Sequence, residues 1–144
     1  MKIFVAFLAI VGTMSAGSPL AAQAYQCRMP KVVSVPKISP QAKPRRLPVT
    51  GYTLAASWSP EFCKGREMQA RHRTQCSGRS GRFAFVAHGL WPESRRNWPQ
   101  WCATRRTVSS AVARANMCMM PSTRLIASQW AKHGSCMSRR PRTY

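Results

Sequence analysis

Two short stretches carry the hydrophobic pattern of β-strands. In residues 52–57, YTLAAS, larger apolar side chains alternate with smaller or polar ones. Successive side chains of a strand point to opposite faces of its sheet, so a period of two predicts a strand. A second run, Phe83–Ala87, is apolar throughout and is typical of a buried strand. We expect this strand to deliver His88 at its end, with Gly89 allowing a tight turn directly after it.

Two later segments favour helices. Residues 105–118, RRTVSSAVARANMC, are compatible with a helix. Residues 121–134, PSTRLIASQWAKHG, predict one more strongly, because Ser122 is a suitable N-cap, no glycine or proline interrupts the segment, and Gly134 provides a C-terminal stop.

Helical spacing in this second segment places chemically active side chains together. Leu125, Gln129 and His133 recur at intervals of four and share one face, with Lys132 beside them. An apolar stripe lies on the adjacent face. We therefore expect this helix to project Gln129, Lys132 and His133 toward a common site.

The N-terminal part of the chain divides into two regions before the folded domain. Residues 1–24 have one lysine, a short apolar run and an A-x-A sequence, which predict a cleaved signal peptide. A membrane anchor is the alternative, but it requires roughly 20 apolar residues, and no later segment has them. Residues 25–49 include five prolines and several basic residues, which predicts an extended, poorly packed arm. Residues 50–144 form the expected globular domain.

Six cysteines follow the predicted signal peptide. An even number in an exported chain indicates three disulfides formed in an oxidising compartment, here the periplasm or the exterior. Zinc binding is the alternative, but no C-x2-C pair or clustered Cys/His spacing is present. Six cysteines allow about 15 pairings, and spacing alone does not choose among them. The cysteines are Cys27, Cys63, Cys76, Cys102, Cys118 and Cys136.

The charge balance is strongly basic. There are 23 Lys and Arg against three acidic residues, Glu61, Glu67 and Glu93, giving a formal net charge of +20. Such a charge predicts attraction to polyanions such as RNA or an anionic envelope surface. Three carboxylates leave almost no material for carboxylate-pair catalysis or for a metal site with oxygen ligands.

The histidines suggest a different chemistry. His88 and His133 each directly precede a glycine, whereas His72 lies between two arginines, where we expect it to be solvated. RNA carries its own nucleophile, the 2′-hydroxyl, so cleavage needs a group that takes this proton and another that protonates the leaving 5′-oxygen. Histidine, with a pKa near ~6.5, suits both roles. Lys132 can stabilise the charge on the phosphate, and Trp91 offers a ring for base stacking.

The surrounding motifs add a family resemblance. HGLWPE at residues 88–93 resembles the first active-site motif of the ribonuclease T2 family, and QWAKHGSC at residues 129–136 resembles the second. LAASWSPEFC and WPQWC are similar to segments found upstream of the first motif and between the two. The resemblance implies an α+β fold, with a central antiparallel sheet, flanking helices and disulfides. It also implies cleavage of single-stranded RNA through a 2′,3′-cyclic phosphate to a 3′-phosphate, without metal or other cofactor.

The same resemblance assigns roles to individual residues. It makes His133 the base, His88 the acid and Lys132 the residue that stabilises the phosphate. Trp91 and Glu93 occupy positions at which the family holds a nucleobase of the RNA. The implied disulfides are Cys63–Cys76 and Cys102–Cys136, which leaves Cys27 to pair with Cys118.

Three departures from the family pattern lower the expected activity. Gln129 replaces a glutamate, and Ser128, a candidate for substrate binding, replaces a frequent histidine. Gln129 can still hydrogen-bond within the catalytic group, but losing the negative charge should lower the pKa of His133. Only residues 137–144 follow the second motif, so we expect an incomplete domain with an exposed sheet edge and exposed apolar surface. We expect a monomer. The alternatives are a weakened or inactive protein that binds RNA or other polyanions, and a product that does not fold stably.

Overall fold

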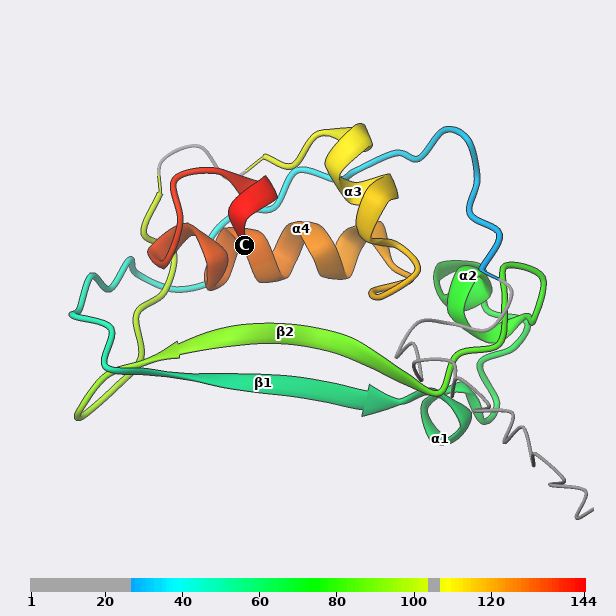
Figure 1. Cartoon of the computed structure of the whole chain (residues 1–144), viewed down its shortest axis with the longest axis horizontal. Helices are drawn as coiled ribbons and strands as arrows, with labels where there is room; N and C mark the ends of the chain where they lie inside the picture. The colour runs from blue at the N-terminus through cyan, green and yellow to red at the C-terminus, as the bar shows by residue number, and fades with distance from the viewer. Residues whose placement is uncertain (1–26, 104–106) are drawn as a thin grey trace, which may run out of the picture.

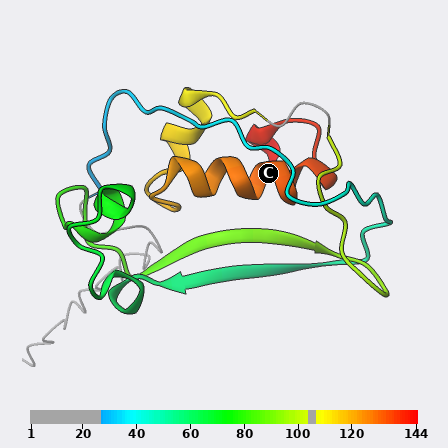
Figure 2. The same cartoon turned by 180° about the vertical axis from the view of Figure 1, so that it is seen from behind.

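The computed structural model describes residues 27–103 and 107–144 (Figure 1). The predicted signal peptide and its cleavage position lie outside these residues. Strands β1 (Gly51–Trp58) and β2 (Phe85–Glu93) form a two-stranded antiparallel sheet. In both Figures 1 and 2, β2 lies between β1 and the helix α4 (Thr123–Lys132). This arrangement is the expected α+β fold.

The second strand is longer than predicted, and His88 lies inside it. Ala55 pairs with Gly89 and Ala56 pairs with Ala87, so His88 is an extra residue without a partner on β1. This is a β-bulge, which redirects the side chain of the extra residue. The expectation that the strand ends before His88 and turns at Gly89 was therefore wrong.

Gly89 is needed for close packing instead of a turn. A Cβ atom at this position would lie 2.3 Å from Oε1 of Gln129, which no side chain can tolerate without displacing its neighbours. Glycine thus lets β2 approach α4 closely at the residue next to His88.

Both predicted helices are present. Helix α3 spans Ser110–Asn116, and α4 begins after Ser122, whose hydroxyl accepts a hydrogen bond from the backbone N–H of Leu125. This cap satisfies one of the donors that a helix leaves unpaired at its N-terminus. Helix α4 ends at Lys132, and the 3₁₀ turn η2 (Gly134–Cys136) follows directly.

The segment between Cys63 and Cys76 contains short helical elements. It is framed by helices α1 (Ser59–Cys63) and α2 (Arg73–Cys76), with the 3₁₀ turn η1 (Ala70–His72) before α2. His72 is only partly exposed, and its ring meets the Phe62 ring edge-on, with 5.1 Å between the centroids. His72 is therefore partly shielded by Phe62 but keeps contact with solvent.

The basic arm is extended, as predicted, but it is not poorly packed. Val33 is buried in the main apolar cluster, together with residues of α3 and α4. Farther along, Arg45 and Gln100 exchange backbone hydrogen bonds of 2.9 Å in both directions. The arm therefore contributes a residue to the core, although the adjacent Val32 is 86% exposed. The buried cluster consists of Val33, Val108, Ala113, Met117, Met120, Ile126 and Trp130.

Three disulfides connect the arm, the short helices and the loops. They join Cys27 to Cys118, Cys63 to Cys76, and Cys102 to Cys136, as the family resemblance implied. Within residues 27–103 and 107–144, no helix is long and apolar enough to cross a membrane. The same residues contain no cluster of three or more His, Cys, Asp or Glu side chains that could hold a metal ion.

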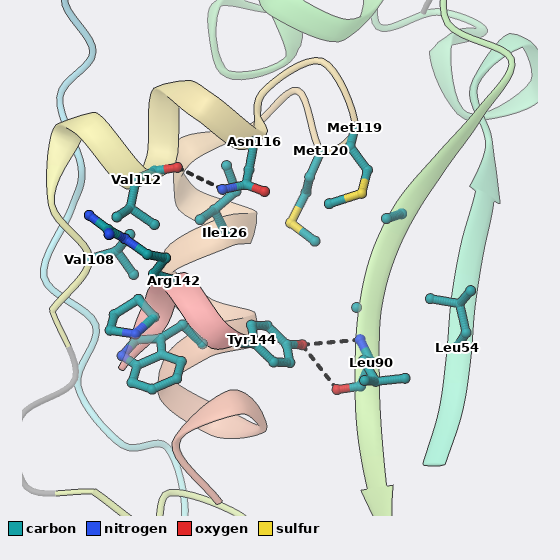
Figure 3. A pocket seen from close by; sticks show the side chains of 14 residues that line it. Leu54, Leu90, Val108, Val112, Asn116, Met119, Met120, Ile126, Arg142 and Tyr144 are labelled. Carbon is teal, nitrogen blue, oxygen red and sulfur yellow. Dashed lines mark hydrogen bonds between the residues drawn. The ribbon is translucent and has the colours of Figure 1, made fainter. Parts of the chain in front are cut away.

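The sheet exposes apolar side chains. Tyr52, Leu54 and Phe85 are 60%, 71% and 65% exposed. The edge of β2 that faces away from β1 is less open than expected, however. The hydroxyl of Tyr144 accepts a hydrogen bond of 3.1 Å from the backbone N–H of Leu90 and donates one of 3.0 Å to its carbonyl (Figure 3). Such capping satisfies groups that an unpaired strand edge would otherwise leave free.

Behind this capped edge lies an apolar pocket of about 370 Å³. Figure 3 shows Met119, Met120 and Ile126 on one side of it and Tyr144 and Leu90 on another. Met119 also accepts a backbone hydrogen bond from Ala87, which secures β2 close to His88.

Candidate active site

The bulge on β2 brings His88 into a partly buried position against β1. Nδ1 of His88 lies 3.3 Å from Oγ of Ser57, within hydrogen-bonding distance. A hydrogen bond at one ring nitrogen fixes which nitrogen remains for proton exchange with a substrate. Ser57 was missed in the sequence because this contact depends on how the two strands pair.

The second histidine approaches from the end of α4. His133 follows the last residue of the helix and is only 7% exposed. Its ring stacks on that of Trp91, with centroids 5.7 Å apart and planes inclined by 29°. The His88 ring meets Trp91 edge-on, at 5.9 Å and 85°. The two predicted catalytic histidines therefore both contact the ring of a single tryptophan.

Burial makes the neutral form of His133 favourable. It lowers the pKa of His133 from 6.5 to about 4, with further lowering by the positive charges of Lys132 and His88. Its buried Nδ1 has no hydrogen-bond partner among the residues that the structure describes, so no acceptor there stabilises the protonated ring. A neutral imidazole near pH 7 can accept a proton.

Gln129 lies next to Trp91 and is 8% exposed. Its Oε1 accepts a hydrogen bond of 2.8 Å from Nε1 of Trp91. Gln129 thus holds the ring that contacts both histidines. It supplies an acceptor at this position but no negative charge.

The chain around the Cys102–Cys136 disulfide holds Lys132 and His133 in place. The carbonyl of Lys132 accepts a 2.8 Å hydrogen bond from the backbone N–H of Trp101. Ser135 accepts one from the backbone N–H of Cys102, at 3.1 Å. The run WPQWC therefore fixes the end of α4.

A pocket of about 280 Å³ opens on the His133 side of the site. It is lined by Trp91, Glu93, Lys132 and His133, four of the predicted site residues, together with Trp98. The Glu93 carboxylate is oriented by a 3.0 Å hydrogen bond from the Thr53 hydroxyl. Aromatic rings beside a carboxylate acceptor can hold a nucleobase.

Trp98 is a site residue that the sequence analysis did not identify. The guanidinium of Arg45 lies 5.2 Å from the centre of its ring, and Nη1 of Arg45 donates to the Trp98 carbonyl at 3.0 Å. The tryptophans and prolines around Trp98 in the sequence gave no reason to select it over its neighbours as a site residue. The arm therefore helps to position a pocket residue.

A larger pocket, of about 680 Å³, opens on the His88 side. Ser57, His88 and Ser128 are among the residues that line it. The hydroxyl of Ser128 donates to the Leu125 carbonyl at 3.0 Å. Ser128 is therefore separated from Trp91 and Glu93, the other predicted substrate-binding residues, and lies in the pocket that contains His88.

Around Trp91 the structure thus brings together two histidines, a lysine and a carboxylate. A model of the Ribonuclease T2 family matches residues 50–144. The chain belongs to this family.

Two curated proteins are also similar. A protein named ribonuclease from Aeromonas hydrophila is 40% identical over 85 residues, which is 59% of this chain and 36% of that protein. A probable ribonuclease from Haemophilus influenzae is 31% identical over 103 residues, covering 63% of this chain and 38% of that protein. The chain thus spans less than two fifths of the length of either relative. No solved structure matches.

Proposed function

We propose that the protein is an endoribonuclease that cleaves single-stranded RNA with His133 as base and His88 as acid. The observation that carries this proposal is the pair of histidines that both contact the ring of Trp91, one of them buried with a lowered pKa that favours its neutral form. Membership of the Ribonuclease T2 family supports it.

In the first step, neutral His133 removes the proton of a 2′-hydroxyl, and the 2′-oxygen forms a bond to the adjacent phosphorus. The bond from phosphorus to the 5′-oxygen breaks, and protonated His88 gives its proton to this leaving oxygen. Lys132 lines the same pocket as His133 and stabilises the negative charge that develops on the phosphate. The product is a 2′,3′-cyclic phosphate.

In the second step the histidines exchange roles. His88, now neutral, takes a proton from water, which attacks the cyclic phosphate, and His133 returns a proton to the 2′-oxygen. This yields a 3′-phosphate. The substrate supplies its own first nucleophile, so we propose that neither step needs a cofactor.

The upstream base is proposed to bind in the pocket formed by Trp91, Glu93 and Trp98. Glu93 can accept hydrogen bonds from amino or imino groups of the base, and the tryptophans can stack on it. Gln129 acts through Trp91, whose ring it holds.

A second candidate is a non-catalytic binder of RNA or of an anionic envelope surface. Two observations favour it: the net charge of +20, and the absence of a negative charge at Gln129. Three disulfides are consistent with a periplasmic or extracellular location for either function. We propose such a location, and a monomer.

The test uses the purified, oxidised protein with EDTA, a short RNA and the 2′-deoxy version of the same oligonucleotide. The enzyme predicts cyclic-phosphate ends from RNA only, and the loss of these products in His88→Ala and in His133→Ala. Binding of both oligonucleotides without cleavage would instead support the non-catalytic candidate.

A further inference from the structure

The pocket on the His88 side extends well beyond the catalytic residues. From Ser57 and His88 it continues to Arg71 and His72 on η1 and to Arg124 on the first turn of α4. Its volume of about 680 Å³ lies within the range of small-molecule sites, which is roughly 300–1,000 Å³. The pocket is therefore larger than a single histidine side chain and its substrate atom require.

The lining of this pocket combines two kinds of side chain. Val33, Val86 and Met117 are buried, while Arg71 and Arg124 are exposed. None of the described residues that line the pocket is acidic. Apolar side chains together with arginines suit a nucleoside that carries a phosphate.

Arg71 is held in place before any ligand binds. Its Nε and Nη2 both donate to Oε1 of Gln69, at 3.3 and 3.2 Å. A guanidinium has five N–H donors, so the remaining ones are available to a phosphate oxygen. Fixing the side chain in advance reduces the entropy that binding would otherwise cost.

The segment that carries Arg71 is itself restrained. The Cys63–Cys76 disulfide closes it, and the edge-on contact of Phe62 with His72 packs it internally. Burial and the charges of Arg71 and Arg66 lower the pKa of His72, so the positive charge here comes from arginine.

The proposed mechanism indicates which part of the RNA would lie in this pocket. His88 protonates the leaving 5′-oxygen, so the nucleoside attached to that oxygen departs on the His88 side. We propose that Arg71 and Arg124 bind the next phosphate downstream, on the 3′ side of that nucleoside. This assignment of direction rests on the proposed function.

The experiment uses ligands that cannot be cleaved. The reference is a dinucleotide with 2′-deoxyuridine upstream and adenosine downstream. Two further ligands carry one additional phosphate, either at the 3′ end or at the 5′ end. Dissociation constants are measured by calorimetry in EDTA at low salt, for the full protein, for Arg71→Gln/Arg124→Gln, and for Arg139→Gln/Arg140→Gln, a control with the same loss of charge at exposed positions.

For the unaltered protein, the 3′-phosphate should tighten binding by about fivefold, the scale of one net hydrogen bond. Each phosphate neutralised should also steepen the salt dependence by about 0.7 in the logarithmic slope. Arg71→Gln/Arg124→Gln should lose the gain from the 3′-phosphate, and Arg139→Gln/Arg140→Gln should keep it.

Several results would overturn the subsite: no gain from the 3′-phosphate, an unchanged gain in Arg71→Gln/Arg124→Gln, or no binding of any of the ligands. A gain from the 5′-phosphate that requires these arginines would overturn the direction. The proposed function fails separately: if the all-ribose dinucleotide is not cleaved while the 3′-phosphate gain persists, the enzyme is excluded and the phosphate subsite remains.

Discussion

Replacing Gln129 with glutamate places a carboxylate one helical turn before His133. The side chain is buried, and Nε1 of Trp91, 2.8 Å from its oxygen, would donate a hydrogen bond to the new carboxylate. A negative charge there favours the protonated imidazole, so the pKa of His133 should rise from its present value of about 4.

The size of the rise follows from the helix geometry. Side chains one turn apart lie about 6 Å from each other. At that separation and an effective dielectric constant of roughly 20, two unit charges attract by about 2.8 kcal/mol, equivalent to about 2 pKa units. We therefore expect the pKa of His133 to reach about 6 in Gln129→Glu.

The assay has two arms. Histidine ring resonances, followed by NMR between pH 3.5 and 8, report the pKa of His133 whether or not the protein is active. The pH dependence of kcat/KM on a dinucleotide reports the same group in catalysis, because activity requires neutral His133. Its acidic limb should lie near pH 4 in the unaltered protein, where the pKa of His133 is about 4, and about 2 units higher in Gln129→Glu.

Gln129→Leu is the matched control, since it removes the hydrogen bond to Trp91 and adds no charge. An unchanged or lower pKa of His133 in Gln129→Glu would refute the electrostatic reasoning. An equal rise in Gln129→Leu would also refute it, because the cause would then be greater exposure of the ring.

Three further predictions concern packing and stability, each measured by urea unfolding. Gly89→Ala should cost about 1–3 kcal/mol, because the new Cβ would lie 2.3 Å from Oε1 of Gln129. Tyr144→Phe should cost about 1–3 kcal/mol, because the backbone N–H and C=O of Leu90 both lose their hydroxyl partner. Stability should also fall as the pH drops from 6.5 through about 4, because the pKa of His133 is depressed in the folded state and the unfolded chain binds the proton first; His133→Gln should remove this part of the pH dependence.

Each of these has its own control. Gly51→Ala, also on a strand, adds a Cβ whose nearest neighbour is 3.9 Å away and should be nearly neutral, so equal losses at the two glycines would contradict the packing argument. Tyr52→Phe, at an exposed position, should change stability by less than about 0.5 kcal/mol. If it matches Tyr144→Phe, the edge contact is not responsible. A pH dependence that is the same in His133→Gln would assign the effect to other groups.

Local sequence signals predicted the helix that carries the site. Ser122 caps α4 and Lys132 ends it, as the capping residue and the uninterrupted apolar stripe indicated. The face bearing Gln129 and His133 was predicted by the same spacing, because a helix determines its own geometry. The disulfide pairing came only from the family resemblance.

Contacts between distant segments could not be predicted in this way. The bulge at His88 depends on how β2 pairs with β1, and the Ser57 contact follows from that register. Val33 is buried because helices much later in the chain cover it. Trp98 is positioned by Arg45 of the arm, 53 residues earlier in the sequence. None of these contacts leaves a local pattern.

The most direct test of the two-histidine assignment compares leaving groups. Uridine 3′-(p-nitrophenyl phosphate) releases p-nitrophenolate, which departs without needing a proton, whereas a dinucleotide releases a 5′-hydroxyl that does. The measurement is kcat/KM on both substrates for the unaltered protein, His88→Ala and His133→Ala. The account predicts that His88→Ala loses activity on the dinucleotide but retains most of it on the nitrophenyl ester, while His133→Ala loses activity on both. Equal losses on both substrates in His88→Ala, or retained activity in His133→Ala, would contradict it.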